Sequence, residues 1–294
     1  NCSGGPTPWG SWLTCEETTV GIASNPPYAR EHGYVFEVPA HADNQVVAEP
    51  LKAMGRFTHE AIAVDPRSGI VYQTEDYSAA GFYRFIPAKP GNLRAGGALQ
   101  MLAIRDRPHF DARTGQQMGV ILPATWVDIA DPDPVNAAVD PSAVYRQGLA
   151  QGAATFSRLE GAWCADGVIY FHATDGGDVR IGQIWHYTPT GEDVGQLSLL
   201  FESPSTEVLN APDHITVSPR GGTIICEDGD GTHAICGLTR RGDIFEFARN
   251  LVGGENTSEF AGACFSPDGQ YLFVNSQNTG YTYAIWGPWE RGAL

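Results

Sequence analysis

A short unit with fixed internal spacing recurs five times along this chain of 294 residues. Each copy contains two runs of β-branched and aromatic residues, separated by a turn of Pro, Gly or Asp residues. In four copies a Cys or a carboxylate lies six residues before a landmark in the turn, and a carboxylate lies nine residues after it. A chain with this regularity is built from repeated strand units. The landmarks are Pro8, Pro66, Asp166, Pro219 and Pro267.

A further aromatic strand completes each unit. Its copies begin at Gly33, Gly81, Gly182 and Gly242, with a looser copy at Thr282, so the unit returns roughly every 40 to 60 residues. This period, with three or four strands per unit, is typical of a β-propeller. We therefore predict an all-β fold, a β-propeller of about five to six blades.

The segment 105–154 interrupts the repeat. TWVDIADPDP reads as a strand followed by a Pro-rich turn, and PSAVYRQGLAQGA has Ala, Gln and Arg at helical spacing behind a Pro-Ser start. We interpret the segment as a partly helical insertion that crosses one face of the propeller and could hold a degenerate blade. It is too structured for a linker, so residues 1–294 are predicted to form a single domain.

The composition is that of a globular protein with an acidic surface. Hydrophobic residues make up 42% of the chain and charged residues 18%, and the formal net charge is −16. This charge argues against a nucleic-acid partner, because phosphate backbones are bound by clustered Lys and Arg. The sequence contains no apolar run long enough to span a membrane. We expect a monomer that acts on a small molecule.

The repeated offsets predict a ring of ligand-forming side chains. In a propeller the first strand of each blade lines the central channel, so equivalent positions of successive blades converge on one axis. The fifth copy has Ala261 and Ser276 at the two offsets, with Glu259 two residues upstream of Ala261. The first offset is filled by Cys2, Glu60, Glu160 and Asp213, and the second by Glu17, Glu75, Asp175 and Asp228.

Carboxylates that face one point repel one another. Two unit charges ~4 Å apart interact by about 4 kcal/mol at an effective dielectric near 20, so such a ring needs protons or cations. A cluster of several metal ions is the interpretation we favour, although acids next to Gly can simply cap turns. Carboxylates suit calcium, whereas a thiolate from Cys2 among carboxylates indicates a transition metal such as iron.

The other cysteines are interpreted mainly as buried thiols within strand runs. Cys226 and Cys236 flank an acidic Gly turn and could instead form a disulfide across a hairpin. Two arginines have the same strand parity as ring acids. Arg158, two residues before Glu160, is predicted to bind an anionic substrate, and Arg56 could either do the same or balance charge.

At several of these positions the chain resembles the PhoX family of bacterial alkaline phosphatases. The resemblance rests on NCSGGPTPWGSWLTCEE, GRFTHE, SRLEG, NAPDHITVSPRG and FSPDGQYLFVNSQ. It implies a six-bladed propeller, hydrolysis of phosphomonoesters by a centre of two ferric irons with calcium ions, and secretion by the twin-arginine route. A periplasmic or extracellular location is therefore expected.

The resemblance also implies roles for individual residues. The family's cysteine ligand of iron falls on Cys2, its metal-binding glutamates fall on Glu17, Glu60 and Glu160, and its phosphate-contacting arginine falls on Arg158. Cys2, Arg158 and Glu160 are thus the expected catalytic set. The motif that looks like a calcium-binding portion contains Asp213, Glu227 and Asp228.

The chain is much shorter than the larger family members and begins at the cysteine motif, so we expect upstream residues to be missing.

Two other functions remain open at this point. A calcium-dependent propeller lactonase or phosphotriesterase would use no iron and would give Cys2 no role. A non-catalytic propeller would hold calcium only for stability and would bind a partner through its faces.

Overall fold

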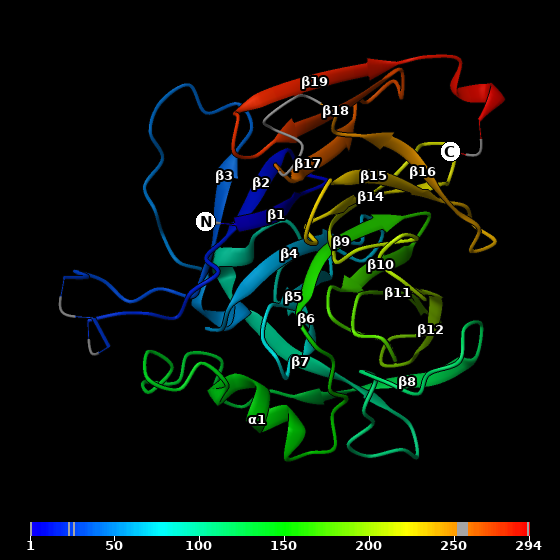
Figure 1. Ribbon diagram of the computed structural model, residues 1–294. Helices are drawn as coiled ribbons and strands as arrows, with labels where there is room; N and C mark the ends of the chain where they lie inside the picture. The colour runs from blue at the N-terminus through cyan, green and yellow to red at the C-terminus, as the bar shows by residue number, and fades with distance from the viewer. Residues whose placement is uncertain (1, 23, 26, 252–257, 293) are drawn as a thin grey trace.

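The structure, a computed structural model, describes residues 2–22, 24–25, 27–251, 258–292 and 294. Its strands form five consecutive antiparallel groups arranged around a common axis (Figure 1). The first three groups are β1 (Cys2–Pro6), β2 (Ser11–Cys15) and β3 (Val35–Pro39); then β4 (His59–Val64), β5 (Val71–Glu75), β6 (Phe82–Pro87) and β7 (Gly97–Ile104); then β9 (Leu159–Ala165), β10 (Val168–Ala173), β11 (Gln183–Pro189) and β12 (Gly195–Glu202). The last two are β13 (Pro212–Val217), β14 (Thr223–Glu227), β15 (Ala234–Leu238) and β16 (Ile244–Arg249), followed by β17 (Phe260–Phe265), β18 (Tyr271–Ser276) and β19 (Tyr281–Trp286).

These groups are the blades of a propeller, numbered one to five along the chain. The first strand of each blade is the innermost: β1 lies beside β4, β4 beside β9, β9 beside β13, and β13 beside β17. The predicted all-β propeller is therefore confirmed, with five blades across the described residues. Short turns between antiparallel neighbours explain the Gly and Pro content that the sequence shows.

The interrupting segment supplies one strand and one helix. β8 (Ile121–Asp128) pairs with β7 of blade two and with β12 of blade three, which joins both blades into a nine-stranded sheet. Its side chains alternate between exposed and buried, as expected for a strand at the outer rim. The predicted helix is α1 (Ala143–Leu149). The idea of a degenerate blade in this segment is wrong, because β8 completes an existing sheet. The described residues also include three 3₁₀ turns: η1 (Lys52–Met54), η2 (Leu93–Ala95) and η3 (Trp289–Arg291).

A buried arginine also connects blades two and three. Arg84, on β6, donates to the Gln100 side chain at 2.7 Å and to the backbone carbonyl of Glu192 at 2.7 Å. Its Nη2 donates to an Asp193 carboxylate oxygen at 2.5 Å, and its guanidinium lies 4.7 Å from the ring centroid of Trp126. These partners compensate for the burial of the charge, which would otherwise be costly.

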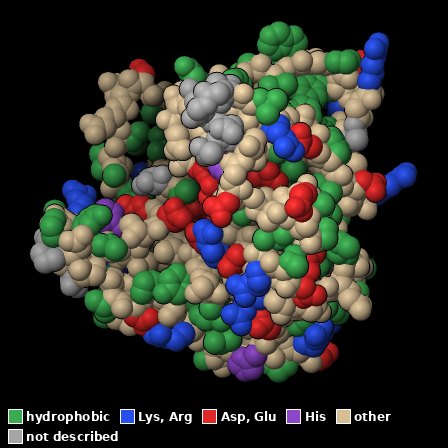
Figure 2. Space-filling view, viewed as in Figure 1, with side chains coloured by type: hydrophobic (Ala, Val, Ile, Leu, Met, Phe, Trp, Pro, Cys, Tyr) green, Lys and Arg blue, Asp and Glu red, His purple; other side chains and the backbone are tan. Residues whose placement is uncertain are grey.

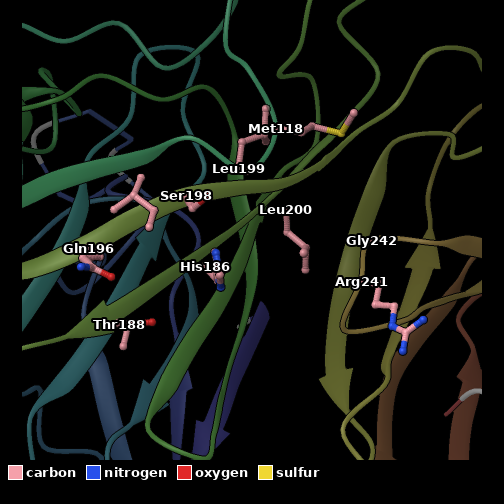
Figure 3. A pocket seen from close by; sticks show the side chains of 11 residues that line it. Met118, His186, Thr188, Gln196, Ser198, Leu199, Leu200, Arg241 and Gly242 are labelled. Atoms are coloured by element: carbon pink, nitrogen blue, oxygen red, sulfur yellow. The ribbon is translucent and has the colours of Figure 1, made fainter.

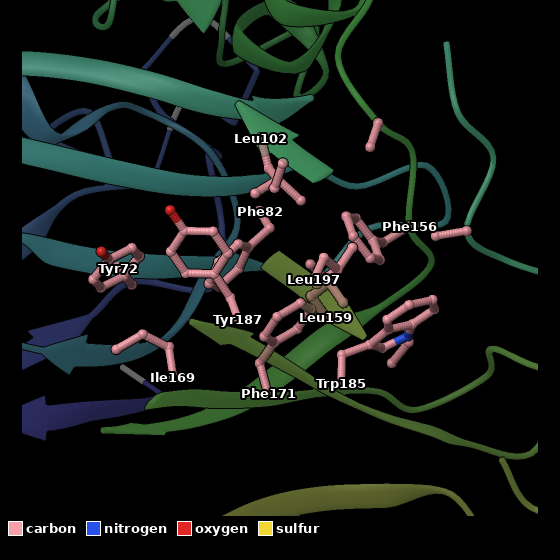
Figure 4. Close-up of a cluster of buried hydrophobic side chains, with 14 of the residues drawn as sticks. Tyr72, Phe82, Leu102, Phe156, Leu159, Ile169, Phe171, Trp185, Tyr187 and Leu197 are labelled. Atoms are coloured by element: carbon pink, nitrogen blue, oxygen red, sulfur yellow. The ribbon is translucent and has the colours of Figure 1, made fainter. Parts of the chain in front are cut away.

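The main apolar core fills the space between blades two and three. Figure 4 shows aromatic rings from both blades in contact there. Phe82 of β6 stacks on Phe171 of β10 with ring centroids 4.1 Å apart, and Phe156 meets Trp185 edge to face at 5.7 Å. Because side chains alternate along each strand, one face of β10 and β11 packs into this core and the other turns away.

The described chain contains no helix that is long and apolar enough to cross a membrane. The disulfide considered for Cys226 and Cys236 does not form, and both thiols are free and buried. Cys236 pairs in register with Ile225, whereas Cys226 pairs with Ile235. Paired residues share a face of the sheet and adjacent residues do not, so the two sulfur atoms lie on opposite faces.

Removing one ring from the core should strongly destabilise the protein. We expect Phe171→Ala to lower the free energy of unfolding by about 3–5 kcal/mol, because it leaves a cavity between two blades. Phe273→Ala provides a matched control, since Phe273 is 37% exposed, and it should cost less than about 1 kcal/mol. Urea denaturation followed by tryptophan fluorescence measures both. Equal losses for the two variants would contradict this description of the core.

Candidate active site in the central funnel

Each innermost strand has an irregularity of register at an equivalent place. The shifts in β4, β9 and β13 fall around Glu60, Glu160 and Asp213. The corresponding shifts lie between Cys2 and Gly4 in β1 and between Ala261 and Cys264 in β17. A bulge of this kind removes a residue from the pairing ladder and redirects its side chain. The bulges therefore turn Glu60, Glu160 and Asp213 toward the axis.

The redirected side chains meet in a cavity of about 420 Å³ at the centre of the propeller. Figure 2 shows acidic side chains gathered in the middle of this face, with basic side chains beside them. One guanidinium, from Arg158, and the thiol-bearing Cys2 also line the cavity. Trp12, Trp163 and His214 contribute to its walls. Its carboxylates belong to Glu17, Glu60, Glu160, Asp213, Asp228 and Glu259.

The structure thus brings together seven residues singled out from the sequence. They come from four blades, so residues as far apart in the sequence as Cys2 and Asp228 line one cavity. Blade five contributes Glu259 together with the small residues of its bulge. This agrees with the sequence, in which Ala261 occupies the position that holds a Cys or an acid in the other blades. The seven are Cys2, Glu17, Glu60, Arg158, Glu160, Asp213 and Asp228.

Glu75, expected in the second ring, lies outside the cavity. It is fully buried, and its Oε2 accepts hydrogen bonds from the backbone N–H of Gly81 and from the Tyr83 hydroxyl, both at 2.8 Å. Glu75 is the last residue of β5, and the strand ends there. The next residue, Asp76, is the one whose carboxylate contacts Arg158.

Glu227 and Asp175 are also placed elsewhere. Glu227 ends β14, and its carboxylate accepts hydrogen bonds from the backbone N–H groups of Asn210 at 2.8 Å and Ala234 at 3.0 Å. It fastens a loop to blade four, while Asp228, one residue later, lines the cavity. Asp175 pairs with Arg180 through an Oδ2–Nη2 distance of 3.1 Å, outside the cavity lining.

Arg56 does not reach the funnel. Its side chain is buried, donates to the backbone carbonyls of His32 at 2.9 Å and Thr19 at 3.2 Å, and forms an ion pair with Glu31. These contacts anchor the loop between β2 and β3 to blade two. Substrate binding by Arg56 is therefore not supported, and the charge-balancing alternative applies within this loop.

Arg158 is held from the side by two carboxylates. Its Nε and Nη2 donate to the two oxygens of Asp76 at 2.9 and 3.0 Å, and Nη2 also donates to Glu160 at 2.7 Å. Burial lowers the pKa of the guanidinium, but Asp76 and Glu160 outweigh that effect and raise it. The remaining nitrogen, Nη1, has no hydrogen-bond partner among the described residues. Arg158 thus presents one free donor group at the cavity.

Cys2, Glu17 and Glu60 form the tightest group of donor atoms. One ligand-forming atom from each lies within 4.8 Å of the others. The Cys2 thiol donates to Glu60 Oε1 at 3.3 Å, whereas Glu60 Oε2 is buried without a hydrogen-bond partner in the described structure. A buried carboxylate oxygen in this state costs free energy unless a proton or a cation compensates it.

The protonation of the cavity acids shows the same conflict. Burial, followed by neighbouring acids, raises the pKa of Glu60 and of Glu160. Burial and Asp76 raise the pKa of Glu17, and burial together with Asp228 raises the pKa of Glu259 to about 8. The protein alone therefore favours protons on these acids, and a bound cation would take their place.

Several residues that line the cavity or hold its arginine were missed by the sequence reasoning. Asp76 was hidden because the offset pointed to its neighbour Glu75, one position earlier. Glu259 was visible as an acid upstream of the fifth copy but had no equivalent in the other blades. Trp12 and Trp163 carried no signal, because aromatic residues occur in every strand of the repeat.

The fold and the site define a β-propeller with an acid-lined central funnel. A family model described as "Alkaline phosphatase PhoX" matches residues 1–280 of the chain. The chain therefore belongs to the PhoX alkaline phosphatase family, as the sequence motifs indicated. A comparison with curated protein sequences gives no match.

Solved structures with a similar arrangement are remote in sequence. Virginiamycin B lyase from Staphylococcus aureus has 14% identity and a TM-score of 0.44, covering 97% of this chain and 69% of its own. A gluconolactonase from Xanthomonas campestris has 12% identity and a TM-score of 0.44, covering 90% and 64%. The periplasmic gluconolactonase of Pseudomonas aeruginosa has 10% identity and a TM-score of 0.43, covering 92% and 76%.

Glu75 should make the stability of the protein depend on pH. Burial raises the pKa of this carboxyl from 4.5 to about 8. A pKa raised on folding stabilises the folded state below the unfolded value, and the contribution is lost as the pH rises through the folded value. We expect the free energy of unfolding to fall by a few kcal/mol (on the order of 3–5) over this interval.

Glu75→Gln should remove that part of the fall, because the amide stays uncharged and has the same shape. Urea denaturation between about pH 5 and pH 9 compares the variant with the wild type. Glu290→Gln, at an exposed position, is the control and should leave the profile unchanged. Identical slopes for the wild type and Glu75→Gln would show that Glu75 is already ionised in the folded protein.

Proposed function

We propose that this protein is a metal-dependent phosphomonoester hydrolase that uses an iron and calcium centre in the propeller funnel. One observation carries the proposal: six carboxylates, two thiols and one guanidinium with a free donor line the same cavity. Membership of the PhoX family supports a phosphatase reaction. The cavity volume of about 420 Å³ suits a small phosphate ester.

The residues present fit a metal centre. The environment of Glu60 indicates this fit, because its buried Oε2 has no hydrogen-bond partner in the described chain and its Oε1 accepts from the Cys2 thiol. Cys2, Glu17 and Glu60 offer one sulfur and carboxylate oxygens, a donor set suited to iron. Asp213, Asp228 and Glu259 offer oxygen alone, which suits calcium. Glu160 connects the two groups, since Asp213 and Glu60 both influence its pKa.

Bound cations would supply Lewis acidity, polarising a phosphate oxygen and stabilising negative charge in the transition state. The chain's own contribution is to orient and bind. Arg158 Nη1 can donate to an oxygen of the transferring phosphoryl group, where a fixed cation is worth more than in water. Asp76 holds the guanidinium plane through two hydrogen bonds, so the free donor points in one direction.

The Arg158 backbone also contributes to this orientation. Its φ angle of 43° lies in the left-handed region, which a non-glycine residue seldom adopts. The backbone N–H of Arg158 donates to the Tyr77 carbonyl at 2.8 Å, and its own carbonyl accepts from Thr174 N–H at 2.9 Å. Local strain of this kind persists where neighbouring contacts fix it, and here it directs Arg158 toward the funnel.

We expect purified protein to contain iron and calcium and to hydrolyse p-nitrophenyl phosphate at alkaline pH. Cys2→Ser should lower iron content and activity together by roughly 10-fold or more, because a thiolate ligand is lost. Elemental analysis and phosphatase kinetics measure the two effects. Cys264→Ser is the matched control, since Cys264 lines the same cavity on blade five but lies outside the group of Cys2, Glu17 and Glu60.

The same experiment separates the rival functions. Full activity and unchanged metal content in Cys2→Ser would favour a calcium-dependent lactonase or phosphotriesterase, which δ-gluconolactone and paraoxon turnover then distinguishes. A protein that loses thermal stability on calcium removal yet hydrolyses no ester would be a calcium-stabilised binding propeller.

Arg158→Lys should reduce kcat/KM for p-nitrophenyl phosphate by roughly 10²–10³-fold, because lysine cannot bind Asp76 and phosphate in the same fork geometry. Asp76→Asn should reduce it by roughly 10–100-fold and weaken competitive inhibition by inorganic phosphate, since the guanidinium loses its anchor. Arg180→Lys, in an exposed ion pair outside the cavity, should retain wild-type kinetics. If Asp76→Asn bound inorganic phosphate as tightly as the wild type does, Asp76 would not position Arg158 for phosphate binding.

A further inference from the structure

A second cavity, of about 530 Å³, lies away from the funnel. It is formed between the outer strands of blade three and the turn between β15 and β16 of blade four (Figure 3). Its floor comes from β11 and β12, one side comes from residues 118–121 ahead of and on β8, and the opposite side comes from Arg241 and Gly242. The volume is in the range of small-molecule sites.

The floor is a ladder of polar side chains. His186 pairs in register with Ser198, and Thr188 pairs with Gln196. Paired residues share one face of a sheet, so all four side chains point to the same side, opposite the buried core residues Tyr187 and Leu197. Polar side chains on a strand at the rim usually face bulk solvent, whereas these four side chains line a cavity.

None of these four side chains has a hydrogen-bond partner among the described residues. The Ser198 residue is only 6% exposed and lines the cavity. Polar groups that converge on a concave surface with unused hydrogen-bonding capacity are typical of a site for a polar ligand. Hydroxyl, amide and imidazole groups can each donate and accept, as a polyhydroxyl ligand requires.

The charge of this cavity differs from that of the whole chain. The formal net charge is −16, yet among the described residues no carboxylate lines the cavity, and Arg241 is the only Lys or Arg that does. Burial lowers the pKa of His186, which favours its neutral form. The Arg241 guanidinium has no acidic partner in the described structure, whereas its neighbour Arg240 pairs with Asp166 at 2.9 Å. An unpaired guanidinium at a polar cavity attracts anions.

We propose that this cavity binds a monosaccharide-sized polyol that carries one anionic group. Arg241 binds the anion, which is a phosphate or a carboxylate, and Thr188, Gln196 and Ser198 bind hydroxyl groups. Leu200 and Ile121 offer apolar surface for the C–H face of the ligand. The proposal stands apart from phosphatase chemistry, because the site shares no residue with the funnel.

Isothermal titration calorimetry of the purified protein with three probes tests it. The probes are glucuronate, a non-hydrolysable glucose 6-phosphonate and uncharged glucose. At least one anionic probe should bind saturably, and glucose should bind at least roughly tenfold more weakly, because it lacks the charge-assisted contact. A response to only one anion identifies the anionic group.

Variants then locate the binding. Arg241→Gln should weaken it by roughly tenfold or more, and Ser198→Ala should weaken it by roughly two- to tenfold. Arg240→Gln, the adjacent residue with its own acidic partner, is the matched control and should bind as the wild type does. Arg158→Ala is used only to identify any part of the phosphonate binding that takes place in the funnel. Thermal unfolding checks that each variant is folded.

Two results would overturn the inference. The first is the absence of saturable binding of either anion up to about 10 mM, the weak limit of a specific small-ligand site. The second is binding that survives Arg241→Gln but disappears in Arg158→Ala, which would place the ligand in the funnel. The first result leaves the phosphatase proposal untouched and the second agrees with it, so the two proposals fail independently.

Discussion

Mutual repulsion among buried carboxylates is the constraint on which the rest of the funnel depends. Six acids share a cavity with a single guanidinium, and at an effective dielectric near 20 each close pair costs a few kcal/mol when both members are ionised, roughly 4 kcal/mol at ~4 Å. The raised pKa values of Glu60, Glu160 and Glu259 express this cost in the protein alone. Cations remove it, and for that reason the arrangement supports a metal centre better than a purely structural role.

The propeller makes such a concentration of charge possible. Antiparallel blades supply the stability through apolar packing between their faces, as Phe82 and Phe171 show, so the axis itself need not be apolar. Bulges in the innermost strands then turn Glu60, Glu160 and Asp213 out of the ladder and toward the axis. The guanidinium of Arg158 lies beside these acids, and its hydrogen bonds to Asp76 and Glu160 fix its orientation.

The same alternation of side chains explains the difference between the two cavities. On the inner strands the bulges break the alternation and collect acids at the axis. On β11 and β12 the alternation is intact near the rim, and it places His186, Thr188, Gln196 and Ser198 on one surface. The first cavity is therefore negative and the second carries an unpaired Arg241, although both belong to one strongly acidic chain.

By itself the sequence determined the repeated strand units, the propeller class and the convergence of Cys2, Glu60, Glu160 and Asp213. It could do so because rotation about one axis turns equal spacing along the chain into proximity in space. It did not show that Asp76, and not Glu75, holds Arg158, or that Asp228, and not Glu227, lines the funnel. A strand end shifted by one residue reverses the direction of a side chain, and spacing counted along the chain does not record that shift.

Only the tertiary structure decided the partners of each charge. Arg56 and Arg158 have the same parity relative to a ring acid, yet Arg56 is held by the loop between β2 and β3, and Arg158 by Asp76. The pairing of β8 with β7 and β12 was equally invisible, because the two sheet edges that it joins lie far apart in the sequence. Contacts of this kind depend on which surfaces folding brings face to face, and no local pattern encodes them.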